Sequence, residues 1–385
     1  MAKAAWSWSE LAAATLARQF PRVSAARGPD AVVDLLGRVG PIQSQAARAS
    51  FVGVAARLRG ASYDDICAAH ESLRVVRSTS LRGTVHTSTR ELHAALAAVG
   101  GAAQSAFWRR ALSLDQAQLD GFRAELERLT VDAWLSDDVL AAAMTDWLVE
   151  RGPGLSTAAV TTSQSARYAY RGHAAMLRRP INARWEGQGE VLLRSARHAA
   201  GTKPVDVETA LVLLVRAHLA ASGPATRRDL AWWSGARLRQ VDLAVGTLGD
   251  ELARRTGPNG LEYLDLAEPP FEVGDGSPGV RLLPEYDALL LAYDPKARDR
   301  FADAAAVAHT WNKANGVHSP TVLADGRLRG RWKLVRRGDS ALISVQMFPG
   351  ERPLDAGDLA GAASGVGAAL ALTITDVTVA AMPAD

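Results

Sequence analysis

Two glutamines that follow a proline are the residues of this sequence whose types and spacing suit chemistry best. Pro41 interrupts the preceding helical pattern, so residues 41–45 are expected to be extended. Residues two apart in an extended segment point the same way, and Gln43 and Gln45 would present two amides to one spot. Amide oxygens can hold a water molecule and stabilise a developing positive charge through their dipoles. Spacing alone favours a simpler interpretation, in which both are exposed polar side chains at the start of a helix.

The familiar catalytic signatures are missing from the 385 residues. The sequence has no HExxH pair, no Walker loop and no GxSxG turn, and its histidines do not cluster with cysteine at metal-ligand spacing. Cys67 is the only cysteine, which excludes an intrachain disulfide and a CxxC pair. We therefore expect neither a metal nor a cofactor, and the cytoplasm is the expected compartment.

The composition indicates a folded protein built from several units. Hydrophobic residues make up 48% of the chain and charged residues 22%, as in globular proteins. A chain of this length is expected to hold two to four units. The N-terminus lacks the apolar core of a signal peptide, and the longest uncharged run, residues 359–375, is short and broken by glycines. No membrane span is expected.

The clearest local pattern is a winged helix over residues 222–266. Thr226 can cap a helix that Gly235 breaks, and a second helix follows with apolar residues at helical spacing. Two strand-like runs then flank the turn at residues 257–260. A first helix near residues 207–220 completes the unit.

Two weaker copies of this pattern precede it and suggest a repeat. One combines a helix over residues 139–150, a helical stretch near residues 172–178 and a wing over residues 183–193. The other combines three helical runs with one strand-like run in the N-terminal region, residues 9–17, 29–39, 46–59 and 73–87.

The pattern changes from residue 280 onward. Strand-like runs joined by turns at residues 325–326 and 338–340 predict a small antiparallel sheet, which a helix over residues 356–370 and a strand over residues 372–382 close. The expected fold class is α+β, with about three tandem winged-helix units followed by a β-rich C-terminal domain. The expected boundaries are residues 1–130, 131–202, 203–276 and 277–385.

Five stretches, taken in order, resemble the AlkZ family of DNA glycosylases. The first is Pro41-x-Gln-x-Gln45, followed by Arg48 and the ending Ala56-Arg57-Leu58. The others run through most of the remaining chain: LRGTVH at residues 81–86, GPAT at residues 223–226 with Asp229 and Trp233, LLPEYDALLLAY at residues 282–293, and HSPTVLADGRLRGRWKL at residues 318–334. Each piece alone is weakly specific, whereas the ordered combination is specific for the fold.

The resemblance implies an enzyme that excises guanine alkylated at N7 from double-stranded DNA, with Gln43 and Gln45 as catalytic residues. Glycoside hydrolysis ordinarily uses two carboxyl groups. An N7-alkylguanine already bears positive charge, so its departure needs no general acid. Two neutral amides could place the water and stabilise the oxocarbenium-like sugar. The family carries an apolar residue between the glutamines, whereas Ser44 stands here and could alter substrate choice.

Several basic residues are candidates for DNA contact. Arg48 adjoins the glutamines, and Arg82 and His86 could grip a phosphate or brace the water, although a structural arginine and a packed histidine explain them better. Arg237 and Arg239 begin the expected recognition helix. Four cations alternate along one strand and would share one face, which fits a DNA backbone track or an ordinary solvated face: Arg327, Arg329, Arg331 and Lys333.

Arginine supplies nearly all of the positive charge, because lysine occurs at only five positions and the formal net charge is +3. Arginine favours bidentate phosphate contacts, although a GC-rich genome would give the same bias.

Two other functions fit parts of the pattern. A winged-helix transcription regulator would explain the helices but not the paired glutamines, and it would bind a specific sequence rather than a lesion. An enzyme with the same fold could act on bulky natural-product adducts or interstrand crosslinks, in self-resistance or repair. A crosslinked base cannot easily leave the duplex, so we expect an open cleft and limited base flipping. A monomer is the expected state.

Overall fold

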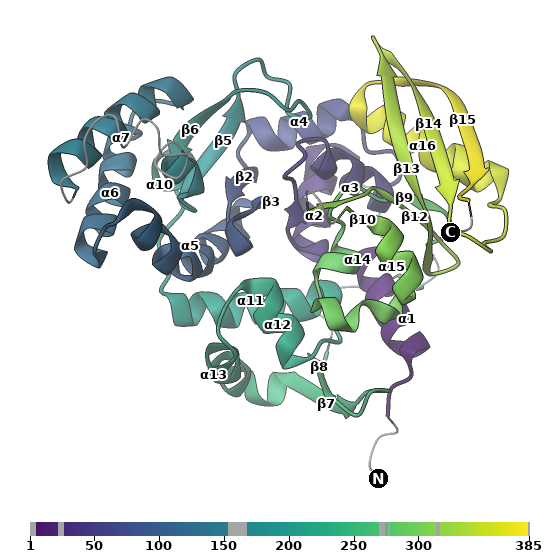
Figure 1. Cartoon of the computed structure of the whole chain (residues 1–385). Coiled ribbons are helices and arrows are strands. Elements are labelled where there is room, and N and C mark those ends of the chain that lie inside the picture. The colour runs from purple at the N-terminus through teal and green to yellow at the C-terminus, as the bar shows by residue number, and fades with distance from the viewer. Residues whose placement is uncertain are drawn as a thin grey trace.

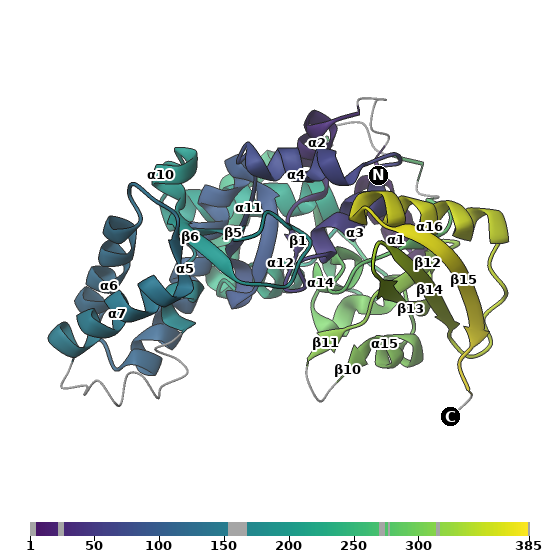
Figure 2. The ribbon, with the colours of Figure 1, turned by 90° about the horizontal axis from the view of Figure 1, so that it is seen from above.

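The computed structural model describes residues 5–21, 27–152, 168–268, 274–275, 278–312 and 316–383. Helices α6 (Gln116–Leu129) and α7 (Asp137–Arg151) lie at one end of the molecule, and the C-terminal sheet lies at the other (Figures 1 and 2). None of the helices in these ranges is long and apolar enough to cross a membrane.

The N-terminal region forms two helices and then the segment that carries the glutamines. In α2 (Pro29–Val39) a proline occupies the first turn, the apolar residues at helical spacing are buried, and Gly40 ends the helix with a φ of 79°. These bounds match the predicted helix. The other elements of this region are α1 (Trp8–Gln19), β1 (Ile42–Gln43), α3 (Ala49–Arg57), α4 (Tyr63–Glu71), β2 (Val75–Thr79), the short 3-10 helix η1 (Leu81–Gly83) and β3 (Val85–Thr89).

A long helix, α5 (Arg90–Leu112), leads into the second region, which adds α6, β4 (Leu135–Ser136), α7, η2 (Tyr170–Gly172), β5 (Met176–Pro180), β6 (Val191–Ser195) and α10 (Ala196–Ala200). The helix predicted near residues 172–178 is wrong, because residues 176–180 form a strand paired along its whole length with β6. Pairing with a distant strand overrides the local pattern here. Since β2 also pairs with β5, the first two regions share one six-stranded sheet, in the order β1-β3-β2-β5-β6-β4.

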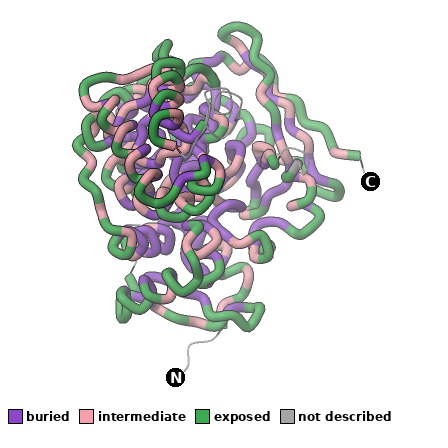
Figure 3. Tube along the Cα trace, turned by 60° about the vertical axis from the view of Figure 1, so that its left-hand side comes forward, coloured by how far each residue is buried: buried purple, intermediate pink, exposed green. Residues whose placement is uncertain are grey.

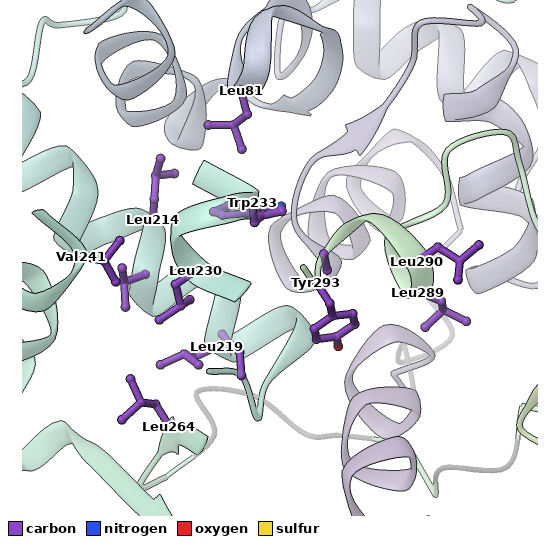
Figure 4. Packing of buried hydrophobic residues seen from close by; sticks show 14 of the residues in the cluster. Leu81, Leu214, Leu219, Leu230, Trp233, Val241, Leu264, Leu289, Leu290 and Tyr293 are labelled. Carbon is purple, nitrogen blue, oxygen red and sulfur yellow. The ribbon is translucent and has the colours of Figure 1, made fainter. Parts of the chain in front are cut away.

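The third region has the three helices and the two paired strands that were predicted for it. Thr226 caps α12 through a reciprocal capping box with Asp229, and Gly235 ends that helix in the left-handed conformation. Figure 4 shows the core that these elements share with the segment around Tyr293. The bounds are α11 (Val207–Ser222), α12 (Arg227–Ser234), α13 (Leu238–Leu248), η3 (Gly249–Glu251), β7 (Leu252–Thr256) and β8 (Glu262–Leu266).

The C-terminal region contains a five-stranded sheet in the order β15-β14-β13-β12-β9. The sheet is mixed rather than antiparallel as expected, because α16 carries the chain across from β14 and makes β15 run parallel to it. The elements are β9 (Arg281–Leu282), α14 (Ala288–Leu291), η4 (Pro295–Arg300), α15 (Ala304–Thr310), β10 (Trp311–Asn312), β11 (Val317–His318), β12 (Thr321–Ala324), β13 (Arg327–Arg337), β14 (Ser340–Met347), α16 (Ala356–Leu370) and β15 (Thr373–Ala381).

The cores join regions that are distant in sequence. One cluster packs α2, α3 and α4 against α16 and the C-terminal sheet, and another packs the winged helix of α11–α13 against residues 283–306. Buried segments accordingly run through the middle of the molecule, with exposed ones outside (Figure 3). Helix α3, which follows the glutamines, is therefore held from several sides. The mixed α and β content is confirmed, whereas the number of winged-helix units and the four domain boundaries stay predictions.

Candidate active site

The segment that carries the glutamines is extended at Ile42 and Gln43, which form β1, whereas Gln45 lies in a bend beyond the strand, so the predicted extension of residues 41–45 holds only in part. Ile42 and Gln43 pair with β3, where Gln43 lies opposite His86, and the amide of Ser44 donates to the carbonyl of Val85 at 2.8 Å. Gln43 is buried, with 8% of its surface exposed, whereas Gln45 is exposed. The strand therefore fixes the backbone of Gln43, and the side chains of the two glutamines lie in different environments.

The LRGTVH segment holds both amide oxygens. Arg82 donates its Nη2 to Oε1 of Gln43 at 3.2 Å, and the backbone amide of Val85 donates to Oε1 of Gln45 at 3.1 Å. An amide oxygen has two lone pairs, so each retains capacity to accept a further hydrogen bond. One short stretch of chain thus orients the two groups that the sequence singled out.

Arg82 connects the glutamine strand to the third region. Its Nη1 donates to the carbonyl of Trp233 at 2.5 Å, and its guanidinium lies 4.5 Å from the ring centroid of Trp232. Arg298 packs on the same ring at 5.1 Å. Burial lowers the pKa of Arg82 to about 10, and nearby Arg298 contributes, so the guanidinium stays charged at neutral pH. These contacts favour a structural role for Arg82 over the phosphate contact that the sequence also allowed.

His86 is buried, with 3% of its surface exposed. Its Nδ1 lies 3.0 Å from the carbonyl of Thr84 and 3.1 Å from Oγ of Ser80. Burial, followed by the charge of Arg82, lowers the pKa of His86 to about 3. The imidazole is therefore neutral near pH 7 and has almost no surface available to a phosphate, as expected for a packed histidine.

Ser44 points away from the glutamines. Its side chain is fully buried, and its Oγ forms a 2.8 Å hydrogen bond with Oγ1 of Thr87 on β3. The departure from the family pattern is thus accommodated within the sheet, and both amides are retained.

The acidic residues of the LLPEYDALLLAY segment pair with arginines that follow the glutamines. Arg48 donates to Oε1 of Glu285 at 2.5 and 3.0 Å, and Arg57 forms a two-pronged contact with Asp287 at 2.9 Å for each bond. The second pair is almost wholly buried. The sequence resemblance marked both stretches, but only the structure shows that they meet.

A cavity of about 540 Å³ opens beside Gln45. Among the described residues that line it, Gln45 and Arg48 are present and Gln43 is not. The structure therefore does not bring both glutamines to this cavity. The remaining lining residues come from the residues directly after Gln45, the loop before β6, the segment after β9 and the C-terminal region: Ala46, Ala47, Arg184, Glu186, Gly187, Gln188, Glu285, Tyr286, Val317, Leu334, Arg336, Leu370 and Leu372.

The other basic candidates are dispersed. Arg237 and Arg239 are exposed at the start of α13. The predicted face of four cations is wrong for Arg329, because the β-bulge in the β12–β13 pairing leaves it opposite no partner residue, and it is buried in ion pairs with Asp325 and Glu351 at 2.7 Å each. Of the other three cations, Arg327 and Lys333 are exposed, and Arg331 donates to Gln346 at 2.9 Å.

Sequence reasoning missed Trp232, Glu285 and Tyr286 as neighbours of the site. Tyr286 has a positive φ of 59°, which is uncommon for a residue other than glycine. Glu285 and Tyr286 lie within a stretch already marked by resemblance, whereas no sequence signal marked Trp232.

Comparison with known proteins places the chain among the DNA glycosylases. The solved structure of the Streptomyces sahachiroi DNA glycosylase AlkZ shares the fold, with a TM-score of 0.74 over 98% of this chain and 100% of that one, at 19% identity. The interstrand DNA cross-link repair glycosylase of the same organism is 26% identical over 364 residues, which cover 89% of this chain and 91% of that protein.

The family follows from a broader match. A family model described as DNA glycosylase AlkZ-like matches residues 36–372. The chain belongs to the AlkZ-like DNA glycosylase family, and it is an enzyme of that class. The match begins within α2, ends just before β15 and includes every segment that the resemblance used.

Proposed function

We propose that this protein hydrolyses the N-glycosidic bond of N7-alkylguanine in duplex DNA, with Gln43 and Gln45 as the catalytic residues. The observation that carries the proposal is the support of both amide oxygens by one segment, Arg82 donating to Gln43 and the Val85 amide donating to Gln45. Fixed dipoles of this kind stabilise developing charge without reorganising during the reaction.

The chemistry suits a cationic base. A quaternised guanine leaves without protonation, so the enzyme has only to position a water and stabilise positive charge at C1′ of the sugar. Gln45, which is exposed and beside the cavity, is the better placed to hold the water, and Gln43 acts from the adjoining buried position. The nearby carboxylate of Glu285 is engaged by Arg48, which favours the amides over an acid–base pair.

The lesion we propose is a bulky adduct or an interstrand crosslink. The relative that is 26% identical is named for the repair of interstrand crosslinks. We propose that the exposed cations Arg237, Arg239, Arg327 and Lys333 contact the DNA backbone without sequence preference, and that the protein acts as a monomer with limited base flipping. The family match does not favour the transcription-regulator alternative.

The decisive experiment is alkali-revealed strand cleavage of a duplex that contains one N7-alkylguanine. Wild-type protein, Gln43→Ala and Gln45→Ala are compared on methyl and bulky adducts. We expect product from the wild type and little from either variant, with duplex binding retained. No product from the wild type on any adduct, with binding intact, would exclude the proposed reaction and return the regulator to consideration.

A further inference from the structure

We propose that the cavity beside Gln45 receives the substituent attached to the modified base, and that this substituent has a flat or aliphatic apolar body with a hydrogen-bonding periphery. This inference rests on the proposed glycosylase function. The 540 Å³ of the cavity fall within the range of sites for drug-sized molecules, roughly 300–1,000 Å³. A methyl group at N7 would need no such space, so the cavity fits a larger adduct.

The two sides of the cavity differ in chemistry. Its apolar side comes from the C-terminal region, with Leu334 on β13, Leu370 at the end of α16 and Leu372 before β15. Leu370 and Leu372 belong to the hydrophobic core that α16 shares with the C-terminal sheet, and Leu334 packs against it, so this wall is the edge of that core. Phosphates and sugars bind polar and cationic groups and would leave the edge uncovered. A substituent with an apolar body would cover it.

The charged groups of the polar side are paired with one another. Arg48 binds Glu285, and Arg184 binds Glu186 at 2.9 Å. Arg336 lies 3.9 Å from the same Glu186. Two carboxylates offset two of the three arginines in the lining, so the cavity favours a neutral substituent that exchanges hydrogen bonds at its edges over a cationic one.

The segment around Tyr286 places a ring at the wall between two anchored neighbours. Glu285 is held by Arg48 and Asp287 by Arg57, so the backbone on both sides is fixed. Tyr286 itself adopts a φ of 59°, a conformation that a structure retains only where its surroundings impose it. A tyrosine ring held in this way offers a rigid surface on which a flat group could stack.

The remaining wall ties the cavity to the catalytic segment. Oε1 of Gln188, in the loop before β6, accepts a hydrogen bond from the backbone amide of Ala47 at 2.9 Å. Ala47 lies two residues after Gln45, so this hydrogen bond ties the loop to the glutamine segment. A substituent seated in the cavity would therefore be positioned with respect to the water-holding amide, which links its recognition to the reaction.

Strand β13 allows a sharp test, because neighbouring residues point to opposite faces of a strand. Leu334 and Arg336 line the cavity, whereas the described lining does not include Val335 or Arg337. Leu334→Trp and Arg336→Trp would fill the cavity. Val335→Trp and Arg337→Trp are matched controls, and the arginine pair loses the same charge at exposed positions of the same strand.

The experiment measures single-turnover excision of N7-methylguanine and of an N7-guanine adduct with a neutral aromatic substituent, each in the same duplex. We expect both filling variants to keep the methyl rate and to lose the bulky-adduct rate on the order of tenfold or more, while both controls keep both rates. Arg336→Trp, at an exposed position, decides the matter if Leu334→Trp does not fold.

The outcomes separate the inference from the function it rests on. If the wild type releases neither lesion, the proposed function fails. If the wild type releases both lesions, two results would contradict the inference alone: filling variants that release the bulky adduct as fast as the controls do, or filling variants whose excision rates fall equally for both lesions. In either case the glycosylase function stands and the cavity does not select the substituent.

Discussion

Arg82 reaches from the turn between β2 and β3 to Gln43, and the 3.2 Å hydrogen bond to Oε1 makes it a direct support of the amide that we propose to be catalytic. The same guanidinium donates to the carbonyl of Trp233 and stacks on Trp232. The orientation of Gln43 therefore depends on α12 as well as on its own strand.

Replacement of Arg82 should lower the rate of excision more than the affinity for DNA. We expect Arg82→Ala to reduce the single-turnover rate about 10–100-fold, as for residues that orient a reacting group. The single-turnover rate of Arg82→Lys should lie between those of the wild type and Arg82→Ala, because an ammonium cannot donate to Gln43 and Trp233 with the fork geometry of a guanidinium. Rates and dissociation constants are measured on the same duplex, and weaker binding with an unchanged rate would instead identify Arg82 as a phosphate contact.

The pair Arg57–Asp287 should contribute strongly to stability. Both side chains are at most 4% exposed, so Asp287→Ala leaves a buried guanidinium without its partner and should lower the free energy of unfolding by about 3–5 kcal/mol. Asp34→Ala, which removes the partly exposed pair with Arg38 on α2, should cost under about 1 kcal/mol. Urea denaturation measures the loss of unfolding free energy in each variant. Equal losses would show that the buried pair contributes no more than the partly exposed one.

The buried histidines should make the fold sensitive to acid. Burial lowers the pKa of His86 to about 3, below the value of about 6.5 in an unfolded chain. The unfolded state therefore binds a proton first, and the stability contributed by the neutral imidazole is complete above pH 6.5 and is lost as pH falls toward 3. The loss is about 1.4 kcal/mol for each pH unit and each such histidine.

Thermal unfolding between pH 7.5 and pH 4.5 measures this dependence. His86→Asn should unfold at a temperature that varies less with pH than that of the wild type, whatever its stability at neutral pH. His198→Asn, at an exposed position, serves as the control. Parallel curves for the wild type and His86→Asn would show that His86 is protonated in the folded protein.

Neighbouring cations of β13 should behave differently. Lys333→Ala should weaken duplex binding in a salt-dependent way and reduce the salt slope by about one, because an exposed lysine can neutralise one phosphate. Arg329→Ala should leave binding nearly unchanged and lower the melting temperature, since it removes the partner of Asp325 and Glu351. Binding titrations at several salt concentrations and thermal melts distinguish the two, and a loss of binding with Arg329→Ala alone would reverse the assignment.

The hydroxyl pair Ser44–Thr87 should show coupled substitution effects. Ser44→Val leaves the buried hydroxyl of Thr87 without this partner and should cost about 1–3 kcal/mol, whereas the double variant with Thr87→Val should recover much of that loss. A double-mutant cycle by urea denaturation gives the coupling energy, and additive losses would mean that the hydrogen bond contributes nothing.

Local signals in the sequence were enough for the elements that depend on neighbours in the chain. The cap at Thr226 and the break at Gly235 defined α12, and Pro29 and Gly40 bounded α2. Prediction failed where a distant partner decided the structure, because β5 owes its conformation to β6 and β15 its direction to the crossover of α16. Periodicity within a segment carries no information on such partners.

The same distinction applies to the site. The proline and the spacing predicted an extended segment with two amides, and β1 confirms the extension at Ile42 and Gln43 but not at Gln45. The donors that hold those amides come from about 40 residues away, at Arg82 and Val85, and alternation along β13 could not reveal the bulge that buries Arg329. That Gln45 borders a cavity formed largely by later segments also required the folded chain.

The Ser44–Thr87 contact has a consequence for how members of this family are recognised. The two positions lie 43 residues apart, yet a hydrogen bond joins their hydroxyl groups, and a change of polarity at one leaves the other mismatched. They should therefore vary together among homologues, hydroxyl with hydroxyl and apolar with apolar. A search pattern that requires an apolar residue between the glutamines would miss enzymes like this one. A pattern that also allows a hydroxyl residue there, when the position of Thr87 carries one too, would include them.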